Sequence, residues 1–232
     1  MPSDVIHVAH ALIGDLPDDL HASLSGAELR RADEFKLASR REEFVAGRFL
    51  LRKLLEHCGG QEGAGHEIVT TDKGKPVCVG GPGISISHSG QHVFCTVVSD
   101  GDIGIDAEVP PPPRDAEKIA RRFFTEREAA WVAEDPDARF LLLWVIKEAW
   151  LKATGLGLSG GLDRLECDIL PPTIKARLAD DVSVHLSAFK QGATFVGLAT
   201  TTTQHRSVKA LRWASGTNGL TPDPTLECVA ST

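Results

Sequence analysis

The chain has 232 residues, of which 42% are hydrophobic and 25% are charged, and its formal net charge at pH 7 is −7. This composition predicts an ordinary soluble globular protein with one large domain or two small ones. Because binding to nucleic acid or to a membrane surface rests on an excess of lysine and arginine, the negative charge argues against both, and any anion site must be local.

The five cysteines are widely scattered, form no CxxC pair and have no histidine at zinc-ligand spacing, which is typical of reduced thiols. The amino terminus lacks the basic and then apolar run of a signal peptide, and no stretch is long enough to span a bilayer. We therefore expect a cytoplasmic protein with no nucleic-acid or membrane partner.

The first part of the chain predicts a strand at residues 5–13, followed by two helices. Two serine–glutamate pairs stand in capping-box register and mark the helix starts: Ser25 with Glu28, and Ser39 with Glu42. The second helix is expected to run to about Glu56 and to end at Gly59-Gly60. Three of its arginines share one stripe, which by itself favours a solvated basic face: Arg41, Arg48 and Arg52.

Hydrophobic alternation then predicts four strands, at residues 68–71, 84–90, 93–98 and 102–109. Prolines 110–113 interrupt regular structure. Three helices are expected after them. The first covers residues 115–124, the second is capped by Thr125 with Glu128 and reaches Ala133, and the third runs from Asp135-Pro136 to Gly155. Beyond these we expect three or four strands up to about residue 213 and a loose tail from about residue 215. Strands and helices are mixed in both parts, so the α+β class is predicted.

Two acidic segments carry most of the functional information. In the predicted strand at residues 102–109, apolar residues alternate with Asp106 and Glu108, which therefore project to the same side. In the last predicted helix, Trp144, Glu148 and Lys152 recur at i, i+4 and i+8, which places them on one stripe.

Such carboxylates beside a lysine suit an oxygen-ligated divalent cation that handles phosphate. Each segment alone has a simpler interpretation. Asp106 and Glu108 could lie on a solvated strand edge, and Glu148 with Lys152 could form a surface ion pair worth about 0.3 kcal/mol. The combination of the segments favours the metal-and-phosphate site.

Four motifs follow one another along the chain: Gly74-Lys75-Pro76, Ser87-His88-Ser89, the Gly-Ile-Asp-Ala-Glu of residues 104–108, and the Trp-Val-Ile-Lys-Glu-Ala-Trp-Leu-Lys of residues 144–152. In this order they resemble the 4'-phosphopantetheinyl transferase family, in its surfactin-synthetase activator (Sfp) type. The segment Arg122-Phe123-Phe124 is also similar to the family and could dock a carrier protein, although phenylalanines in an amphipathic helix are usually core.

The resemblance implies two similar α+β halves in one chain, with a pseudo-twofold fold. Residues 1–102 would bind coenzyme A, and residues 103–232 would carry the metal and catalytic residues. The implied reaction moves 4'-phosphopantetheine from coenzyme A to a serine of an apo carrier protein and releases adenosine 3',5'-bisphosphate, with Mg²⁺ as cofactor. The expected partner is an acyl, peptidyl or aryl carrier protein domain, and the fused halves favour a monomer.

The resemblance also implies residue roles. Asp106, Glu108 and Glu148 would be the metal ligands, and Glu148 would also be the general base. Lys152 would hold the reacting phosphate and balance its developing charge. Coenzyme A would be bound by Lys152 together with six other residues: Arg31, Arg48, Lys75, Ser87, His88 and Lys147. Lys147 is expected to give support only, since adjacent helical residues point about 100° apart and it cannot share the Glu148 stripe.

Two functions of other kinds stay open at this point. The chain could be a coenzyme A-binding protein without turnover, although four retained site residues argue against this: Asp106, Glu108, Glu148 and Lys152. It could also be a Mg²⁺-dependent hydrolase that cleaves the coenzyme A pyrophosphate with water. Release of adenosine bisphosphate without a carrier protein would distinguish hydrolysis from transfer.

Overall fold

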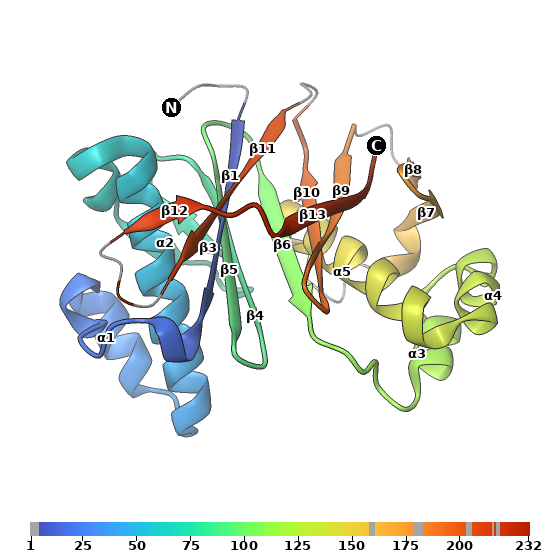
Figure 1. The fold of residues 1–232 in the computed structure, drawn as a ribbon, viewed down its shortest axis with the longest axis horizontal. Helices are drawn as coiled ribbons and strands as arrows, with labels where there is room; N and C mark the ends of the chain where they lie inside the picture. Colours follow the sequence, from blue (N-terminus) through green and yellow to red (C-terminus); the bar gives the residue numbers. More distant parts are fainter. Residues whose placement is uncertain (1–4, 158–160, 179–182, 203–205, 215, 217–218) are drawn as a thin grey trace.

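Two β-sheets lie side by side in the molecule, and each packs against one long helix (Figure 1). The computed structural model describes residues 5–157, 161–178, 183–202, 206–214, 216 and 219–232. Within these ranges, no helix combines the length and the apolar character needed to cross a membrane.

The first sheet has the strand order β12-β11-β1-β5-β4. Its strands are β1 (Val5–Leu12), β4 (Gly83–Ser89), β5 (His92–Val98), β11 (Ser207–Trp213) and β12 (Leu220–Pro222). The accompanying helices are η1 (Ile13–Asp15), η2 (His21–Ser23), α1 (Gly26–Asp33) and α2 (Ala38–Ala64). A separate small hairpin is formed by β2 (Ile68–Thr70) and β3 (Pro76–Cys78).

The second sheet has the order β6-β10-β9-β13-β8-β7. Its strands are β6 (Ile103–Glu108), β7 (Leu165–Leu170), β8 (Thr173–Leu178), β9 (His185–Gln191), β10 (Thr194–Thr200) and β13 (Leu226–Ser231). Its helices are α3 (Ala116–Phe123), α4 (Glu126–Glu134), α5 (Pro136–Thr154) and the short η4 (Leu162–Arg164).

The two halves repeat one plan, which confirms the predicted α+β fold of two similar halves. In each half a strand leads through short helices to a long helix, and a later hairpin returns to pair with that strand: β1 with α2 and β4–β5, then β6 with α5 and β9–β10. One face of each sheet packs on its helix, and a third cluster of buried side chains joins the two sheets, for example Val8 and Phe94 with Ile105 and Leu198. The layers are therefore helix, sheet, sheet, helix.

Local capping chemistry explains where α1 and α4 begin. Ser25 with Glu28 and Thr125 with Glu128 form complete capping boxes at α1 and α4, as predicted. The box predicted at Ser39 was wrong, because α2 begins after Leu37 and no side chain caps it. The predicted stop at the glycine pair is an interruption: Gly60 has a φ of 62°, and the helix continues to Ala64.

The predicted loose tail was wrong over residues 219–232, which form β12 and β13. β12 pairs with β11, and β13 pairs with β9 and β8. In Figure 1 the red β11 lies beside the blue β1 and β12 lies beside β11, so a segment from beyond residue 103 completes the first sheet. Ala230 is fully buried, which shows that the last strand contributes to the core.

Candidate active site

The two halves meet along β4 and β6 through alternate serine side chains. The hydroxyl oxygens of Ser85, Ser87 and Ser89 each accept a bond from a backbone N–H of β6 or the residue after it, at 3.1 Å in every case: Ile105, Ala107 and Val109. Because a strand sends every second side chain to the same face, the Ser-x-Ser-x-Ser pattern provides a ladder of acceptors for a neighbouring strand. The ladder fixes the register of β6 against β4.

The same serines hold the two acidic side chains of β6. The Ser87 hydroxyl donates to Asp106 Oδ1 at 2.9 Å, and the Ser89 hydroxyl donates to Glu108 Oε2 at 2.8 Å. Asp106 and Glu108 therefore project to the same side of the strand, as their alternation predicts. Asp106 is buried and Glu108 is half-buried.

Helix α5 can bring Glu148 and Lys152 to these carboxylates because glycines face its backbone. A Cβ atom at Gly104 of β6 would lie 1.9 Å from the Ala149 carbonyl oxygen, and one at Gly197 of β10 would lie 2.2 Å from that of Val145. No side chain fits at either position, so the helix rests directly on the sheet. Lys152 Nζ then donates to Asp106 Oδ1 at 2.6 Å.

The cluster is short of positive charge. Burial first, and the charge of Asp106 second, raise the pKa of the Glu148 carboxyl to about 7, although Lys152 opposes this shift. Burial also raises the pKa of Glu108, and the bond from Ser89 only partly offsets it. Asp106 Oδ2 and Glu148 Oε1 are buried without a hydrogen-bond partner. Such oxygens are costly unless a cation or a donor reaches them.

The donor set fits a hard cation that shares its ligands with a substrate. Within the described ranges, no three side chains of His, Cys, Asp or Glu are placed so that they could hold a metal ion by themselves. Mg²⁺ does not require such a cage, since it usually binds through one or two carboxylates, water and substrate phosphates. The two unpartnered oxygens of Asp106 and Glu148 provide ligands of that type.

A cavity of about 200 Å³, here called the cleft cavity, lies between the halves and is lined by Lys75, Ser85, Glu148 and Lys152. Lys75 Nζ crosses from one half to the other, where it donates to Asp102 Oδ1 at 3.0 Å and to the Ala153 carbonyl oxygen at 2.6 Å. The cleft cavity thus combines the Glu148 carboxylate with the ammonium groups of Lys75 and Lys152, which suits a phosphate-bearing ligand with its cation.

Next to it lies a cavity of about 400 Å³, here called the histidine cavity, which shares Gly74, Pro76 and Ile86 with the cleft cavity. It is lined by His88, Arg31 and Arg48, among others. His88 Nδ1 lies 3.4 Å from Glu43 Oε2, and burial lowers the pKa of the imidazole although Glu43 opposes this shift. Of the predicted nucleotide-binding residues on the first half, Lys75 lines the cleft cavity and Ser87 lines neither cavity, whereas three line the adjoining histidine cavity: Arg31, Arg48 and His88.

The stripe of arginines on α2 is mostly not solvated. Arg41 is exposed, but Arg48 and Arg52 are buried against Glu28 of α1. Sequence reasoning missed Glu28 as their partner, because its capping-box role already explained it. Arg31 is exposed, pairs with Glu34 and lies 5.4 Å from the centre of the Phe35 ring.

Lys147 is placed differently from its predicted role beside coenzyme A. Its side chain is fully buried, and Nζ lies 2.9 Å from Glu128 Oε1 and donates to the carbonyl oxygens of Leu162 and Leu165. The adjacent Glu148 faces the cleft, and a step of about 100° around the helix turns Lys147 into the core of the second half. The structure does not bring Lys147 to the candidate site.

Aromatic residues near the site are mainly structural. Trp144 stacks on Phe140 at 5.5 Å between ring centres and contacts Phe124 at 6.3 Å. Phe124 is buried, as the simpler interpretation held, whereas Phe123 is 41% exposed and carries the Arg122 guanidinium over its ring. Ser85 and Ser89 were missed as site residues, although the strict alternation of serines on one strand was a visible signal.

The fold and the site define a two-lobed enzyme in which carboxylates of the second half and cations of both halves meet at a cleft. Residues 102–203 match the 4'-phosphopantetheinyl transferase superfamily, and residues 29–98 match the 4'-phosphopantetheinyl transferase N-terminal domain. The 4'-phosphopantetheinyl transferase HetI of Nostoc sp. is 36% identical over 189 residues, which cover 76% of this chain and 78% of the relative.

Other relatives agree. The 4'-phosphopantetheinyl transferase of Bacillus subtilis is 32% identical over 177 residues, covering 73% of this chain and 74% of the relative. The L-aminoadipate-semialdehyde dehydrogenase-phosphopantetheinyl transferase of Homo sapiens is 28% identical over 166 residues, covering 64% and 54%. The chain belongs to the 4'-phosphopantetheinyl transferase family, and it is an enzyme that transfers phosphopantetheine to carrier proteins.

Proposed function

We propose that the chain is an Sfp-type transferase that takes 4'-phosphopantetheine from coenzyme A in the presence of Mg²⁺. The acceptor is a serine hydroxyl on an acyl, peptidyl or aryl carrier protein domain. The serine oxygen forms a bond to the phosphorus that carries the pantetheine arm, the pyrophosphate bond breaks, and adenosine 3',5'-bisphosphate leaves. The observation that carries this proposal is that Glu148 and Lys152 line the same cleft cavity while Lys152 donates to Asp106.

Asp106 and Glu148 are the proposed metal ligands in the present arrangement, and Glu108 would join them when the substrate and ion bind, because no three such side chains of the described ranges are placed to hold a metal by themselves. Mg²⁺ bound there would neutralise charge on the pyrophosphate oxygens. The unpartnered buried oxygens of Asp106 and Glu148 support this assignment, as does the raised pKa of Glu108, because all three indicate a site that lacks positive charge.

Glu148 is the proposed general base, and Lys152 the proposed phosphate ligand. Glu148 lines the cleft cavity, where its carboxylate can accept the serine proton directly or through a water. Lys152 would exchange its present bonds to Asp106 and Ser87 for phosphate oxygens. Its ammonium would balance the negative charge that develops on the leaving phosphate.

The remaining proposed coenzyme A contacts come from Lys75, Ser87, His88, Arg31 and Arg48. They line the cleft cavity and the adjoining histidine cavity or lie on β4 between them. Since coenzyme A carries a pyrophosphate and a separate 3'-phosphate on the ribose, two neighbouring cationic regions suit it. We expect the enzyme to act as a cytoplasmic monomer.

The test is an incubation of the protein with coenzyme A, Mg²⁺ and a panel of apo carrier domains, followed by intact-mass measurement. Each accepted carrier gains the mass of one phosphopantetheine, and a chelator stops the gain. Repeated absence of the gain across the panel would instead favour coenzyme A binding without turnover. Release of adenosine bisphosphate in the absence of any carrier would identify a hydrolase.

A further inference from the structure

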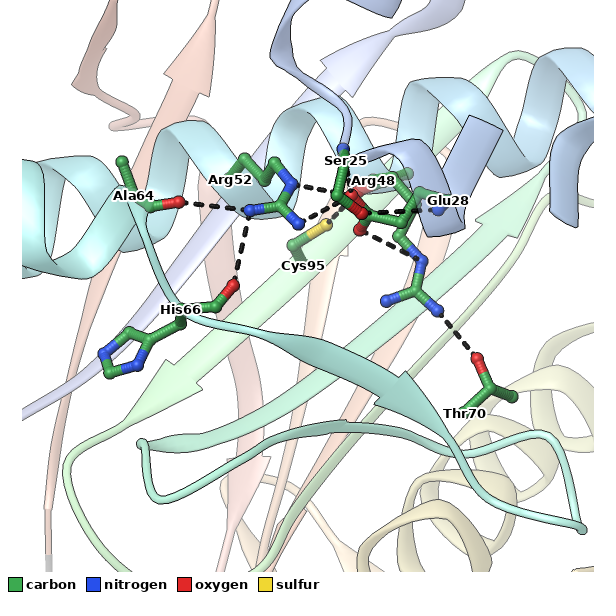
Figure 2. A network of polar contacts seen from close by, with 9 residues as sticks. Ser25, Glu28, Arg48, Arg52, Ala64, His66, Thr70 and Cys95 are labelled. Carbon is green, nitrogen blue, oxygen red and sulfur yellow. Dashed lines mark hydrogen bonds and ion pairs between the residues drawn. The ribbon is translucent and has the colours of Figure 1, made fainter. Parts of the chain in front are cut away.

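Two guanidinium groups of α2 share a single carboxylate of α1 inside the first half (Figure 2). Glu28 is 3% exposed, Arg48 is 4% exposed and Arg52 is 9% exposed. Two buried positive charges against one negative charge leave the network with an excess of one. A buried charge without a partner is costly. The distribution of the Glu28 hydrogen bonds between the two arginines therefore decides which guanidinium stays available to a ligand.

Arg52 forms the hydrogen-bonded ion pair with the Glu28 carboxylate. Its Nε and Nη2 both donate to Glu28 Oε2, at 2.8 and 2.6 Å, and Nη1 donates to the carbonyl oxygens of Ala64 and His66. Glu28 Oε2 also accepts the capping bond from the Ser25 backbone N–H at 2.8 Å. Every nitrogen of this guanidinium is therefore bonded, and the carboxylate is turned toward Arg52.

Arg48 has few hydrogen-bond partners. Its Nε lies 3.9 Å from Glu28 Oε1, which is too far for a hydrogen bond, and Oε1 has no other partner. Nη2 donates to Thr70 Oγ1 at 3.2 Å, whereas Nη1 is buried without a partner, and no dashed line reaches it in Figure 2. Burial lowers the pKa of this guanidinium, and Glu28 only partly opposes the shift.

The Arg48 side chain, whose Nη1 has no partner, lies in the wall of two cavities. One is the histidine cavity, and the other is a cavity of about 580 Å³ lined by Arg31, Arg48 and Arg52. Neither is lined by Glu148 or Lys152, which line the cleft cavity. A phosphate bound at Arg48 is thus a different group from the one beside the proposed metal ligands.

The second half contains the same glutamate–cation pair but without a second buried cation. There the capping-box Glu128 faces one buried cation, Lys147, whose Nζ also donates to two carbonyl oxygens after the long helix. Arg52 corresponds to Lys147, since each ties a capping-box glutamate to the segment that follows its helix. One cation is enough for this structural role, so Arg48 is additional to it.

We propose that Arg52 is a positioning residue for phosphate recognition. By holding Glu28, it keeps that carboxylate from neutralising Arg48, and the free Arg48 guanidinium binds the 3'-phosphate of coenzyme A. This inference rests on the proposed function. Without Arg52, Glu28 would become a buried carboxylate without its main partner, and Arg48, already 3.9 Å away, is the nearest cation that could pair with it.

Calorimetric titration without Mg²⁺ tests the proposal, with coenzyme A and 3'-dephospho-coenzyme A as ligands. We expect Arg52→Gln to weaken coenzyme A binding about tenfold, the scale of one charge-assisted bond, and to change 3'-dephospho-coenzyme A binding by less than about twofold. Glu28→Gln/Arg52→Gln removes both charges and leaves Arg48 free, so it should restore coenzyme A binding to within about twofold of the parent. Arg41→Gln, an exposed arginine on the same helix, is the matched control.

A double variant that binds coenzyme A as weakly as Arg52→Gln would overturn the proposal and reduce Arg52 to a packing role. An equal loss for both ligands would overturn the assignment to the 3'-phosphate. If Arg52→Gln does not fold, Glu28→Gln carries the test, because it leaves Arg48 free: retained coenzyme A affinity supports the proposal and a loss of about tenfold contradicts it. A parent protein that binds neither ligand, with or without Mg²⁺, would contradict the proposed function itself.

Discussion

The two long helices occupy equivalent places in their halves, yet they bring different charged groups to the cavities beside them. Helix α5 directs the carboxylate of Glu148 and the ammonium of Lys152 toward β6, while α2 contributes the guanidinium of Arg48 to the neighbouring cavities. In each half a capping-box glutamate neutralises one buried cation of the long helix. The difference indicates that the glutamate–cation pair is a structural element repeated in both halves, and that the charges outside these pairs are the ones available for the proposed function.

The largest expected effect is on the α5 side of this comparison. Glu148→Gln removes both the proposed base and a metal charge while preserving the side-chain shape, so we expect the rate of transfer to fall by about 10²–10⁴. The fold should be unaffected, because Glu148 Oε1 has no partner that the amide would lose. Single-turnover assays with circular dichroism as the control measure this, and near-normal turnover would remove Glu148 from the mechanism.

The next effect tests whether the glutamate–cation pairs are structural. Lys147→Met leaves Glu128 buried without its cation, and breaking such a pair costs about 3–5 kcal/mol of unfolding free energy. Urea denaturation measures the loss, and Lys147→Met/Glu128→Gln should recover part of it because no unpaired charge remains. Full stability combined with a raised Michaelis constant for coenzyme A would return Lys147 to the substrate site.

A smaller effect is expected where the halves touch through Lys75. Lys75→Ala removes one cation from the cleft cavity, and we expect the Michaelis constant for coenzyme A to rise about tenfold with a lesser change in turnover. Lys118→Ala, an exposed lysine on α3, serves as the control. An unchanged Michaelis constant would reassign Lys75 to joining the halves through Asp102 and the Ala153 carbonyl.

The smallest expected effect is on the pH dependence of stability, and it concerns His10, a buried histidine of the first half. Burial, followed by the neighbouring His92, lowers the pKa of His10 from 6.5 to about 4. The unfolded chain therefore binds the proton more readily, and stability is lost as the pH falls through this interval. Between pH 7 and 5.5 we expect a loss of about 1 kcal/mol that His10→Gln lacks, measured as the difference between the two urea titrations.

Sequence reasoning succeeded where the determinants are local. The capping boxes at Ser25 and Thr125 and the alternation that aligns Asp106 with Glu108 depend on residues two or three positions apart. Gly104 belongs to a motif that the sequence shows. The reason for a glycine there, its close approach to the Ala149 carbonyl oxygen, can be seen only in the folded structure.

The errors involve partners that are distant in sequence. Arg52 looked solvated because Glu28 lies on another helix, and Lys147 looked functional because it stands beside Glu148 in a motif. The carboxy-terminal strands were missed because short, polar segments such as Leu220–Pro222 pair only with strands formed elsewhere. Pairing of this kind leaves little trace in local composition.

The return of Ser207–Trp213 to the edge of β1 also bears on synthesis. During translation β1 emerges first, yet its parallel partner lies far along the chain, so the growing polypeptide displays an open strand edge until the second half has been made. Exposed edges recruit other strands and promote aggregation. The nascent enzyme should therefore depend on chaperones most while the ribosome is still reading the codons of the second half.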